Sequence, residues 1–151
     1  MKVSINEATA SSVYAYDHHN YGPQRAISEA QFYHSKSDDS YPWLQFEFPY
    51  PYKVSSLKII NRRNCCGERL RNLEIRAGYE AVQSDFRGQI STNEIVGTFE
   101  GPGQDGEEIN IYTDTWAKYL TFQILGGKET LQIEEVTIFA TDEKPTPALI
   151  Y

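Results

Sequence analysis

Apolar and polar side chains alternate along several short segments of the chain. In residues 43–48, apolar side chains alternate with Gln45 and Glu47, a pattern typical of a strand that buries one face. Residues 54–60 are mostly apolar, as expected for a strand that is more fully buried. The same reasoning predicts further strands at residues 72–77, 94–99, 108–112, 119–125 and 131–141.

Turn-forming residues separate these segments. Pro49-Tyr50-Pro51 follows the first strand, and proline cannot donate a backbone hydrogen bond inside a central strand. We therefore expect residues 43–48 and 54–60 to form two separate strands. Gly101-Pro102-Gly103 and Gly126-Gly127 mark further turns. No helical periodicity lies between the strands, so the pattern predicts an all-β fold, an antiparallel β-sandwich of the jelly-roll type.

The two ends of the chain lack this pattern. Residues 7–42 are rich in Ser, Tyr, His and Asp and are predicted to form irregular loops. Loops of this length inside a compact domain usually carry function. We assign residues 1–141 to one domain, and we predict that residues 142–151, with Pro145 and Pro147, form a linker or tail.

Composition and charge narrow the range of partners. The chain has 151 residues, enough for one domain, and its 11 tyrosines suit half-buried strands and binding faces. Its net charge of −7 is spread along the sequence, which argues against nucleic acid and anionic lipid as partners. No apolar run is long enough for membrane insertion. The first residues lack the apolar core of a signal peptide, so the chain is either intracellular or a module of a longer secreted protein.

Charge is densest in residues 61–71, Asn-Arg-Arg-Asn-Cys-Cys-Gly-Glu-Arg-Leu-Arg, between two predicted strands. One interpretation is a solvated loop in which Glu68 neutralises an arginine. In the other, Arg62 and Arg69 converge on a sugar, because a guanidinium presents its N–H donors in a fixed fork that fits two neighbouring hydroxyls. Cys65 and Cys66 are too close together for a zinc site. They are either two thiols or a vicinal disulfide, which would offer a rigid apolar plate to a sugar ring.

The run from Asn61 to Leu70 resembles the hallmark motif of F-type lectins, the fucolectin family, in which arginines flank two adjacent cysteines. Residues 42–48, Pro-Trp-Leu-Gln-Phe-Glu-Phe, are similar to a strand shared with the wider discoidin, or coagulation-factor C-domain, group. Residues 31–35 resemble the loop that bears the family's sugar-binding His. Ala26-Ile27 and residues 131–136 are also similar to segments of the family, the second of them to its closing strand. The resemblance covers residues 8–140. It implies a galactose-binding-domain-like jelly roll with long ligand-binding loops at one end.

The resemblance also implies roles for individual residues. Arg62 and Arg69 would hold the hydroxyls and ring oxygen of L-fucose. A disulfide between Cys65 and Cys66 would pack against the sugar ring, and His34 would supply a third polar contact. The loops around the sugar's methyl group would carry Tyr14, His18, His19 and Phe32. The implied protein is not an enzyme but a secreted, extracellular module that binds fucosylated glycans or glycoproteins, in an oligomer or a multi-module parent.

Two features of this sequence depart from the family motif around the arginines. The family's Gly-Asp reads Arg63-Asn64 here, so an amide replaces a carboxylate, although Asn64 can still accept a hydrogen bond from an arginine. The spacing between His34 and Arg62 also differs by one residue from the spacing in the family motif. The family's spacing would put Ser35 at the position of the His.

The calcium-binding loop of the family departs further. Residues 25–30 read Arg-Ala-Ile-Ser-Glu-Ala, whereas calcium takes about six to eight oxygen ligands, carboxylates among them. Glu135 is the side-chain ligand that the resemblance retains, with Glu29 as a displaced substitute. Most of the ligands are therefore missing, and we expect that no cofactor is required. Arg25 is predicted to pair with Glu135 in place of the ion.

The sequence also bears on three other functions. No nucleophile, base and acid stand in a catalytic relation, and adjacent carboxylates such as Glu134-Glu135 would point to opposite faces of a strand. Asp17-His18-His19 with His34 is an alternative metal site, although adjacent histidines rarely bind one ion. The main alternative is a discoidin-like protein-interaction or adhesion domain that has lost fucose binding, which the changes at Arg63-Asn64 and in the calcium loop favour.

Overall fold

The computed structural model describes residues 1–27, 31–83, 90–126 and 129–145. Its strands are β1 (Glu7–Ala10), β2 (Tyr33–His34), β3 (Trp43–Ile60), β4 (Leu73–Gly78), β5 (Glu94–Phe99), β6 (Glu108–Ile124), β7 (Gln132–Ile133) and β8 (Glu135–Ala140). The short helix α1 (His18–Tyr21) and the 3-10 turns η1 (Tyr14–Tyr16), η2 (Pro23–Ala26) and η3 (Gly67–Arg69) complete the described elements. The last residues of the predicted tail, 146–151, lie outside the described residues.

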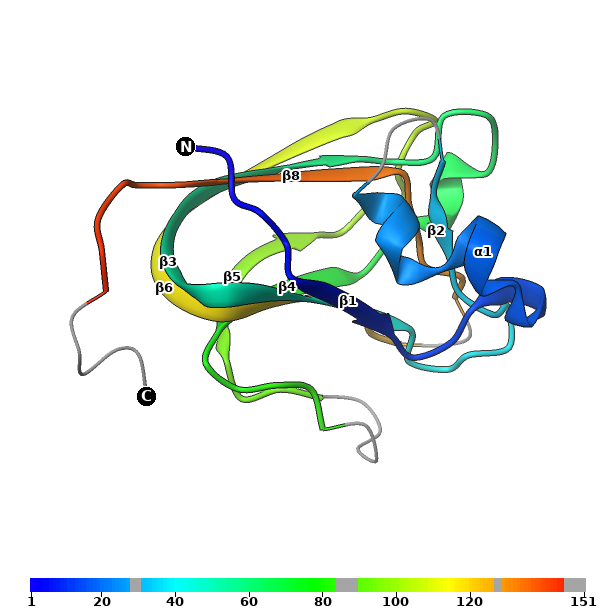
Figure 1. Ribbon diagram of the computed structural model, residues 1–151. Helices are drawn as coiled ribbons and strands as arrows, with labels where there is room; N and C mark the ends of the chain where they lie inside the picture. The colour runs from blue at the N-terminus through cyan, green and yellow to red at the C-terminus, as the bar shows by residue number, and fades with distance from the viewer. Residues whose placement is uncertain (28–30, 84–89, 127–128, 146–151) are drawn as a thin grey trace.

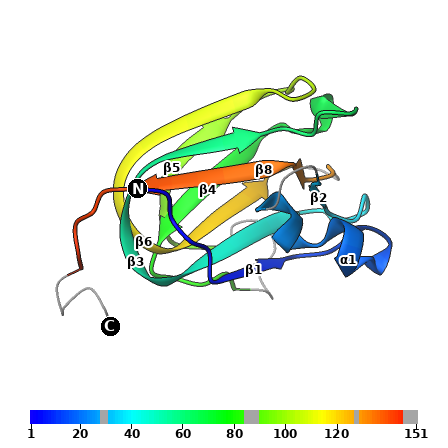
Figure 2. The ribbon, with the colours of Figure 1, turned by 45° about the horizontal axis from the view of Figure 1, so that its top comes forward.

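The strands form two layers that share β3 and β6 (Figure 1). The sheet has the order β1-β3-β6-β4-β5, with β8 paired to β3, and the pairs are antiparallel. Residues 44–47 of β3 pair with β1, whereas its residues 54–60 pair with β8. Figure 2 shows β3 and β6 curving together, so that each passes from one layer into the other. The predicted antiparallel β-sandwich is confirmed.

β3 is one continuous strand where the sequence predicted two. The predicted break at Pro49-Tyr50-Pro51 is wrong, because these residues lie in an irregularity of the ladder. Glu47 pairs with Tyr119, and the next paired residue, Tyr52, pairs with Ala117, so β3 holds more residues here than β6 does. The extra residues of a bulge make no ladder hydrogen bonds, so the N–H groups that proline lacks are not needed. The bulge also bends the strand between the layers.

Three more predictions about the strands are corrected. The strands predicted at 108–112 and 119–125 belong to the single strand β6, which stays paired with β3 through the curved region. The strand predicted at 131–141 is divided between β7, which pairs with β2, and β8, which pairs with β3. Residues 7–42 are not all loop, because they include β1, β2 and three helical turns. β1 is short and its small side chains give a weak pattern, so only its pairing with β3 makes it a strand.

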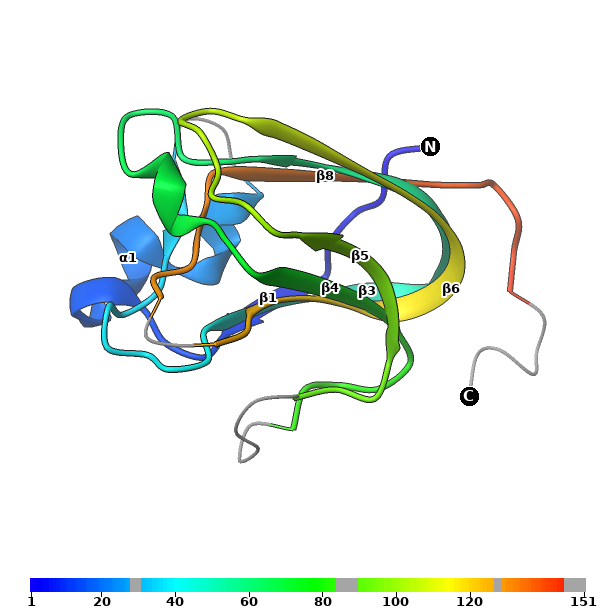
Figure 3. The same cartoon turned by 180° about the vertical axis from the view of Figure 1, so that it is seen from behind.

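The core fills the space between the layers. The alternating side chains Leu44, Phe46 and Phe48 are fully buried there, and so is the predicted core residue Ile133. At one end of the sandwich lie α1 and the green turn η3, away from the N-terminus (Figure 3). Segments far apart in the sequence, within residues 14–27, 31–37 and 61–69, therefore meet at this end.

Candidate functional site

A pocket of about 400 Å³ opens among the loops at this end of the sandwich. It is lined by two arginines, the adjacent cysteines and several aromatic residues, namely Tyr14, Tyr21, Phe32, His34, Ser37, Arg62, Cys65, Cys66 and Arg69. We call this space the arginine pocket. Candidate residues from two separate stretches of the sequence thus face the same space.

The loop from Asn61 to Arg69 is anchored at several points. Asn61 is buried, and its Nδ2 donates to the carbonyl oxygens of Gly67 and Gln104, both at 2.9 Å. The Gly67 N–H donates to Asp105 Oδ1 at 2.8 Å. Residue 67 must be glycine, because a Cβ there would lie 2.4 Å from the backbone of Gln104. These contacts fix the position of η3 and with it the backbone of Arg69.

Cys65 and Cys66 are joined by a disulfide at the turn of this loop. Cys66 has a left-handed φ of 66°, and the chain turns there into η3. Both cysteines are half-buried and line the arginine pocket together with Arg62 and Arg69. Of the two alternatives left open by the sequence, the structure contains the vicinal disulfide.

The two arginines of the pocket differ in their partners. Arg62 Nε donates to Asn64 Oδ1 at 2.6 Å, and the Arg62 guanidinium carbon lies 4.3 Å from the centre of the Phe32 ring. Asn64 therefore orients Arg62, although it is an amide and not the carboxylate of the family motif. The Arg69 guanidinium makes no hydrogen bond or ion pair with any residue that the structure describes. Its N–H donors are available to a ligand.

Arg63 ties the loop to the junction of β7 and β8. Its backbone N–H donates to Oε1 of the buried Glu134 at 3.0 Å, and its Nη1 donates to Glu134 Oε2. Arg63 Nη2 also lies 3.9 Å from Glu135 Oε2. The predicted pair of Arg25 with Glu135 is wrong, since Arg25 Nε donates to the carbonyl oxygen of His19 at 2.7 Å. The cation expected beside Glu135 is thus supplied by Arg63.

The calcium ion implied by the resemblance does not fit these residues. Glu135 lies beside the Arg63 guanidinium, which would repel a divalent cation. Residues 1–27, 31–83, 90–126 and 129–145 contain no cluster of three or more His, Cys, Asp or Glu side chains that could hold a metal. Ser28, Glu29 and Ala30 of the predicted loop lie outside the described residues.

His34 lines the pocket with both of its ring nitrogens already bonded. Nδ1 lies 2.6 Å from the Ser35 carbonyl oxygen, which can only accept, so Nδ1 carries the proton. Nε2 then accepts from Gln132 Nε2 at 2.9 Å. Burial lowers the pKa of His34, the bond to Ser35 opposes that shift, and the charges of Arg62 and Arg69 lower the pKa further. A ligand hydroxyl that donates to His34 Nε2 would therefore compete with Gln132.

Ser35 does not take the place of His34 in the pocket. It is fully buried, and its Oγ accepts from the Leu131 N–H at 2.9 Å. Of these two neighbours, which the spacing of the motif left as alternatives, His34 faces the arginine pocket and Ser35 faces the interior.

Aromatic rings complete the pocket. The ring centres of Tyr14 and His34 are 4.5 Å apart, those of Tyr14 and Tyr21 are 5.2 Å apart, and those of Tyr21 and Phe32 are 5.9 Å apart. We call these four residues the aromatic wall. They combine apolar faces with the polar edges of the tyrosines, a composition common in sites for small organic ligands.

Not every predicted residue lies in the arginine pocket. His18 lines a different groove, and His19 is exposed on α1 outside the lining of this pocket. Asp17 does not form a metal site with them, because it caps α1 and accepts from the backbone N–H and side chain of Asn20 at 3.1 and 2.7 Å. Tyr21 and Ser37 do line the pocket but were not predicted. They lie in stretches with several tyrosines and serines, where no motif distinguishes them.

Comparison with known proteins places this chain in a family. The sequence pattern of the F5/8 type C domain matches residues 7–136. The chain belongs to the F5/8 type C domain family. Because this family includes the discoidin group, the resemblance read from the arginine loop and from residues 42–48 is confirmed at the level of the fold and the family.

Three relatives are similar to this F5/8 type C domain. The Pentraxin fusion protein of Xenopus laevis is 29% identical over 100 residues, which span 66% of this chain and 23% of that protein. Fucolectin of Anguilla anguilla is 35% identical over 54 residues, which span 33% of this chain and 34% of that protein. The crystal structure of an F-lectin (fucolectin) from the serum of Morone saxatilis, the striped bass, has a TM-score of 0.75 and 26% identity, over 89% of this chain and 46% of that chain. The chain thus matches less than half the length of each relative.

The two fucolectins among these relatives are lectins and not enzymes, which agrees with the kind of protein that the sequence predicted. None of the helices that the structure describes is long and apolar enough to cross a membrane.

Proposed function

We propose that this F5/8 type C domain binds L-fucose, alone or as the terminal residue of a glycan. The observation that carries the proposal is Arg69, whose guanidinium lines the pocket without a partner among the described residues, next to Arg62. Neighbouring sugar hydroxyls suit two such groups, because a hydroxyl accepts hydrogen bonds from a guanidinium without proton transfer. The similarity to two fucolectins supports the same class of ligand.

The apolar surfaces of the pocket suit the rest of the sugar. L-fucose is a 6-deoxy sugar, so it carries a methyl group where galactose carries a hydroxymethyl group. The Cys65–Cys66 disulfide would pack against the C–H bonds of the ring, and the aromatic wall would surround the methyl group. A rigid plate and an anchored loop reduce the ordering that binding requires, which matters for a small polar ligand.

We further propose that the domain acts outside the cell as one module of a longer protein or of an oligomer. The relatives support this arrangement, since the chain matches 23% of one, 34% of another and 46% of the third. The third was obtained from serum.

Calorimetry with L-fucose tests the proposal. We expect saturable binding in the high-micromolar to millimolar range, about −4 to −6 kcal/mol. L-galactose is the matched control, because it differs from L-fucose by a hydroxyl on C6. It should bind more weakly, since that hydroxyl would be buried against the aromatic wall without a partner. No saturation with millimolar L-fucose, on protein whose disulfide is intact, would overturn the proposal.

A glycan array separates this function from that of a discoidin-like adhesion domain that has lost fucose binding. The lectin should retain glycans that end in fucose and pass over their defucosylated counterparts. If the protein binds none of the fucosylated glycans on the array, the result would favour the adhesion domain.

A further inference from the structure

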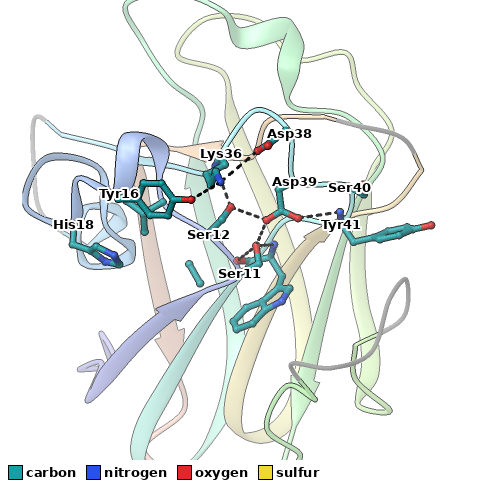
Figure 4. Close-up of a pocket in the computed structure, with 12 residues that line it drawn as sticks. Ser11, Ser12, Tyr16, His18, Lys36, Asp38, Asp39, Ser40 and Tyr41 are labelled. Carbon is teal, nitrogen blue, oxygen red and sulfur yellow. Dashed lines mark hydrogen bonds and ion pairs between the residues drawn. The ribbon is translucent and has the colours of Figure 1, made fainter.

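A second hollow lies at the same end of the molecule, outside the arginine pocket. It has a volume of about 760 Å³, and its lining includes Ser11, Tyr16, Lys36, Asp39, Tyr41 and Trp43 (Figure 4). We call it the tyrosine groove. None of its lining residues belongs to the arginine pocket, so the fucose proposal does not account for it.

The two hollows lie on opposite sides of the same two segments. In the turn η1, Tyr14 lines the arginine pocket and Tyr16 lines the tyrosine groove. In the loop after β2, Ser37 lines the arginine pocket, whereas its neighbours Lys36 and Asp38 line the groove. The groove is therefore a separate site, divided from the arginine pocket by a thin ridge.

The backbone of this ridge is strained in a way that burial does not explain. Ala15 and Tyr16 both have left-handed φ values, 54° and 56°, which are unfavourable for residues with a Cβ. The strain does not serve to bury Tyr16, because this residue is 75% exposed. Instead, Lys36 Nζ donates to the Tyr16 hydroxyl at 3.0 Å and lies 4.6 Å from the ring centre. Strained residues of this kind are concentrated at binding sites, where they hold a side chain ready for a ligand.

The opposite part of the groove is held by Asp39. Its Oδ2 accepts from the hydroxyls of Ser11 and Ser12 at 2.6 and 2.7 Å, and its Oδ1 accepts from the Tyr41 N–H at 3.2 Å (Figure 4). Ser11 Oγ in turn accepts from the Trp43 N–H at 2.9 Å. This network fixes the backbone from which Tyr41 and Trp43 line the groove. The shape of the groove is therefore set before a ligand arrives.

The chemistry of the lining suits a saccharide. The lining includes the aromatic residues Tyr16, Tyr41 and Trp43, while Lys36 and Asp38 provide a donor and an acceptor for hydroxyls. The Asp38 side chain is 74% exposed and lies 3.9 Å from Lys36 Nζ, so it is free to exchange that contact for a ligand. The lining carries two carboxylates, Asp38 and Asp39, and one ammonium group, Lys36. Its net charge is therefore negative, which disfavours an anionic ligand.

We propose that the tyrosine groove is a second carbohydrate-binding site, which takes a neutral or amino-bearing saccharide independently of the arginine pocket. One domain then engages two sugar units, which strengthens its attachment to a surface that displays many glycans. This site does not depend on fucose recognition by Arg62 and Arg69.

The test is an NMR titration of the ¹⁵N-labelled chain with its arginine pocket saturated by L-fucose, repeated on the Arg69→Ala variant without fucose. The probes are N-acetyllactosamine, the glucosamine disaccharide and the anionic 3′-sialyllactose. We expect the indole N–H of Trp43 and the amide of Tyr41 to shift saturably with the first two probes in both proteins. The third probe should bind more weakly. Because Arg69→Ala removes the fucose contact alone, a failure of the fucose proposal leaves this readout intact.

Variants locate the response. Tyr16→Ala should weaken binding about tenfold by removing one aromatic face, and Asp38→Asn should weaken the glucosamine disaccharide more than N-acetyllactosamine. Tyr112→Ala is the matched control, because Tyr112 is 78% exposed and lies on β6 outside the groove. No saturable shift at Trp43 and Tyr41, or equal weakening by Tyr112→Ala, would overturn the proposal. Shifts produced by a basic peptide but by none of the saccharides would overturn it as well, since the groove would then bind protein.

Discussion

The two sides of the arginine pocket are built by different means. The loop from Asn61 to Arg69 is held by directional bonds: to Gln104 and Asp105 at one end, and to Glu134 through Arg63. In the aromatic wall, Tyr14 and Tyr21 stand on short helical turns and His34 lies on β2. The wall is held mainly by contacts between rings, with the two hydrogen bonds of His34 in addition. Hydrogen bonds to a ligand lose strength quickly when a donor is displaced, whereas apolar contact tolerates small shifts. The side that must aim donors is therefore the more firmly anchored one.

The largest effect should come from removing the donors themselves. Arg62→Ala and Arg69→Ala should each weaken fucose binding roughly tenfold to a hundredfold, because each removes charge-assisted hydrogen bonds. Arg62→Lys and Arg69→Lys should also weaken fucose binding, since an ammonium cannot donate to two oxygens in a fixed fork as a guanidinium does. Calorimetry measures the loss. Arg71→Ala is the matched control, an arginine of the same segment that does not line the pocket. If both pocket variants bind like the wild type, the sugar site lies elsewhere.

Removing the contact of Arg63 with Glu134, which anchors the loop from Asn61 to Arg69, should have the next largest effect. Arg63→Ala leaves the buried carboxylate of Glu134 without its guanidinium, so we expect a loss of about 1–3 kcal/mol in the free energy of unfolding. Fucose binding should weaken several-fold, because the loop that carries Arg62 loses a tie. Thermal melting and calorimetry check the two parts. Glu68→Ala, an exposed change in the same loop, should alter neither.

The same anchor bears on calcium. Since Arg63 supplies the cation beside Glu135, EDTA should leave both the melting temperature and fucose binding of the wild type unchanged. A drop in melting temperature that calcium restores would show that an ion is bound in spite of the guanidinium.

Reduction of the disulfide should have a smaller and more local effect. The ring that Cys65 and Cys66 close is minimal, so its loss changes the entropy of the unfolded chain little, while the plate beside the arginines is lost. We expect mild reduction to weaken fucose binding more than it lowers the melting temperature. Mass spectrometry of the active protein should find the two cysteines joined. Two alkylatable thiols in protein that still binds fucose would contradict this prediction.

The smallest effect should come from pH on the aromatic wall. The pKa of His34 is lowered from its ordinary value of 6.5. As the pH falls below 6.5, the unfolded chain therefore takes up this proton before the folded chain does. The free energy of unfolding should decrease until the lower, folded pKa is reached, and fucose binding should weaken as His34 becomes a third positive charge beside Arg62 and Arg69. His34→Gln should flatten both pH profiles, and His19→Gln, an exposed change on α1, should not.

Much of this architecture was readable from the sequence, because it depends on local pattern. Strand β5 was predicted with its observed bounds and β4 within one residue, since alternation reports which side chains face the core. The spacing of arginines around Cys65-Cys66 predicted the loop that the structure places at the pocket. Residues within one short loop stay close together whatever the rest of the chain does, so such a motif needs little tertiary information.

Only the tertiary structure decided which distant residues meet. Nothing in the sequence distinguishes Glu134 from its neighbour Glu135, yet the course of the chain between β7 and β8 buries Glu134 against Arg63. Arg25, the partner predicted for Glu135, bonds to His19 instead. The continuity of β3 through two prolines likewise depends on pairing with β6, which no local pattern records. The tyrosine groove arises from the same cause. Its two sides come from segments that lie side by side only when β1 pairs with β3, because long-range pairing and not local preference fixes where a loop lies.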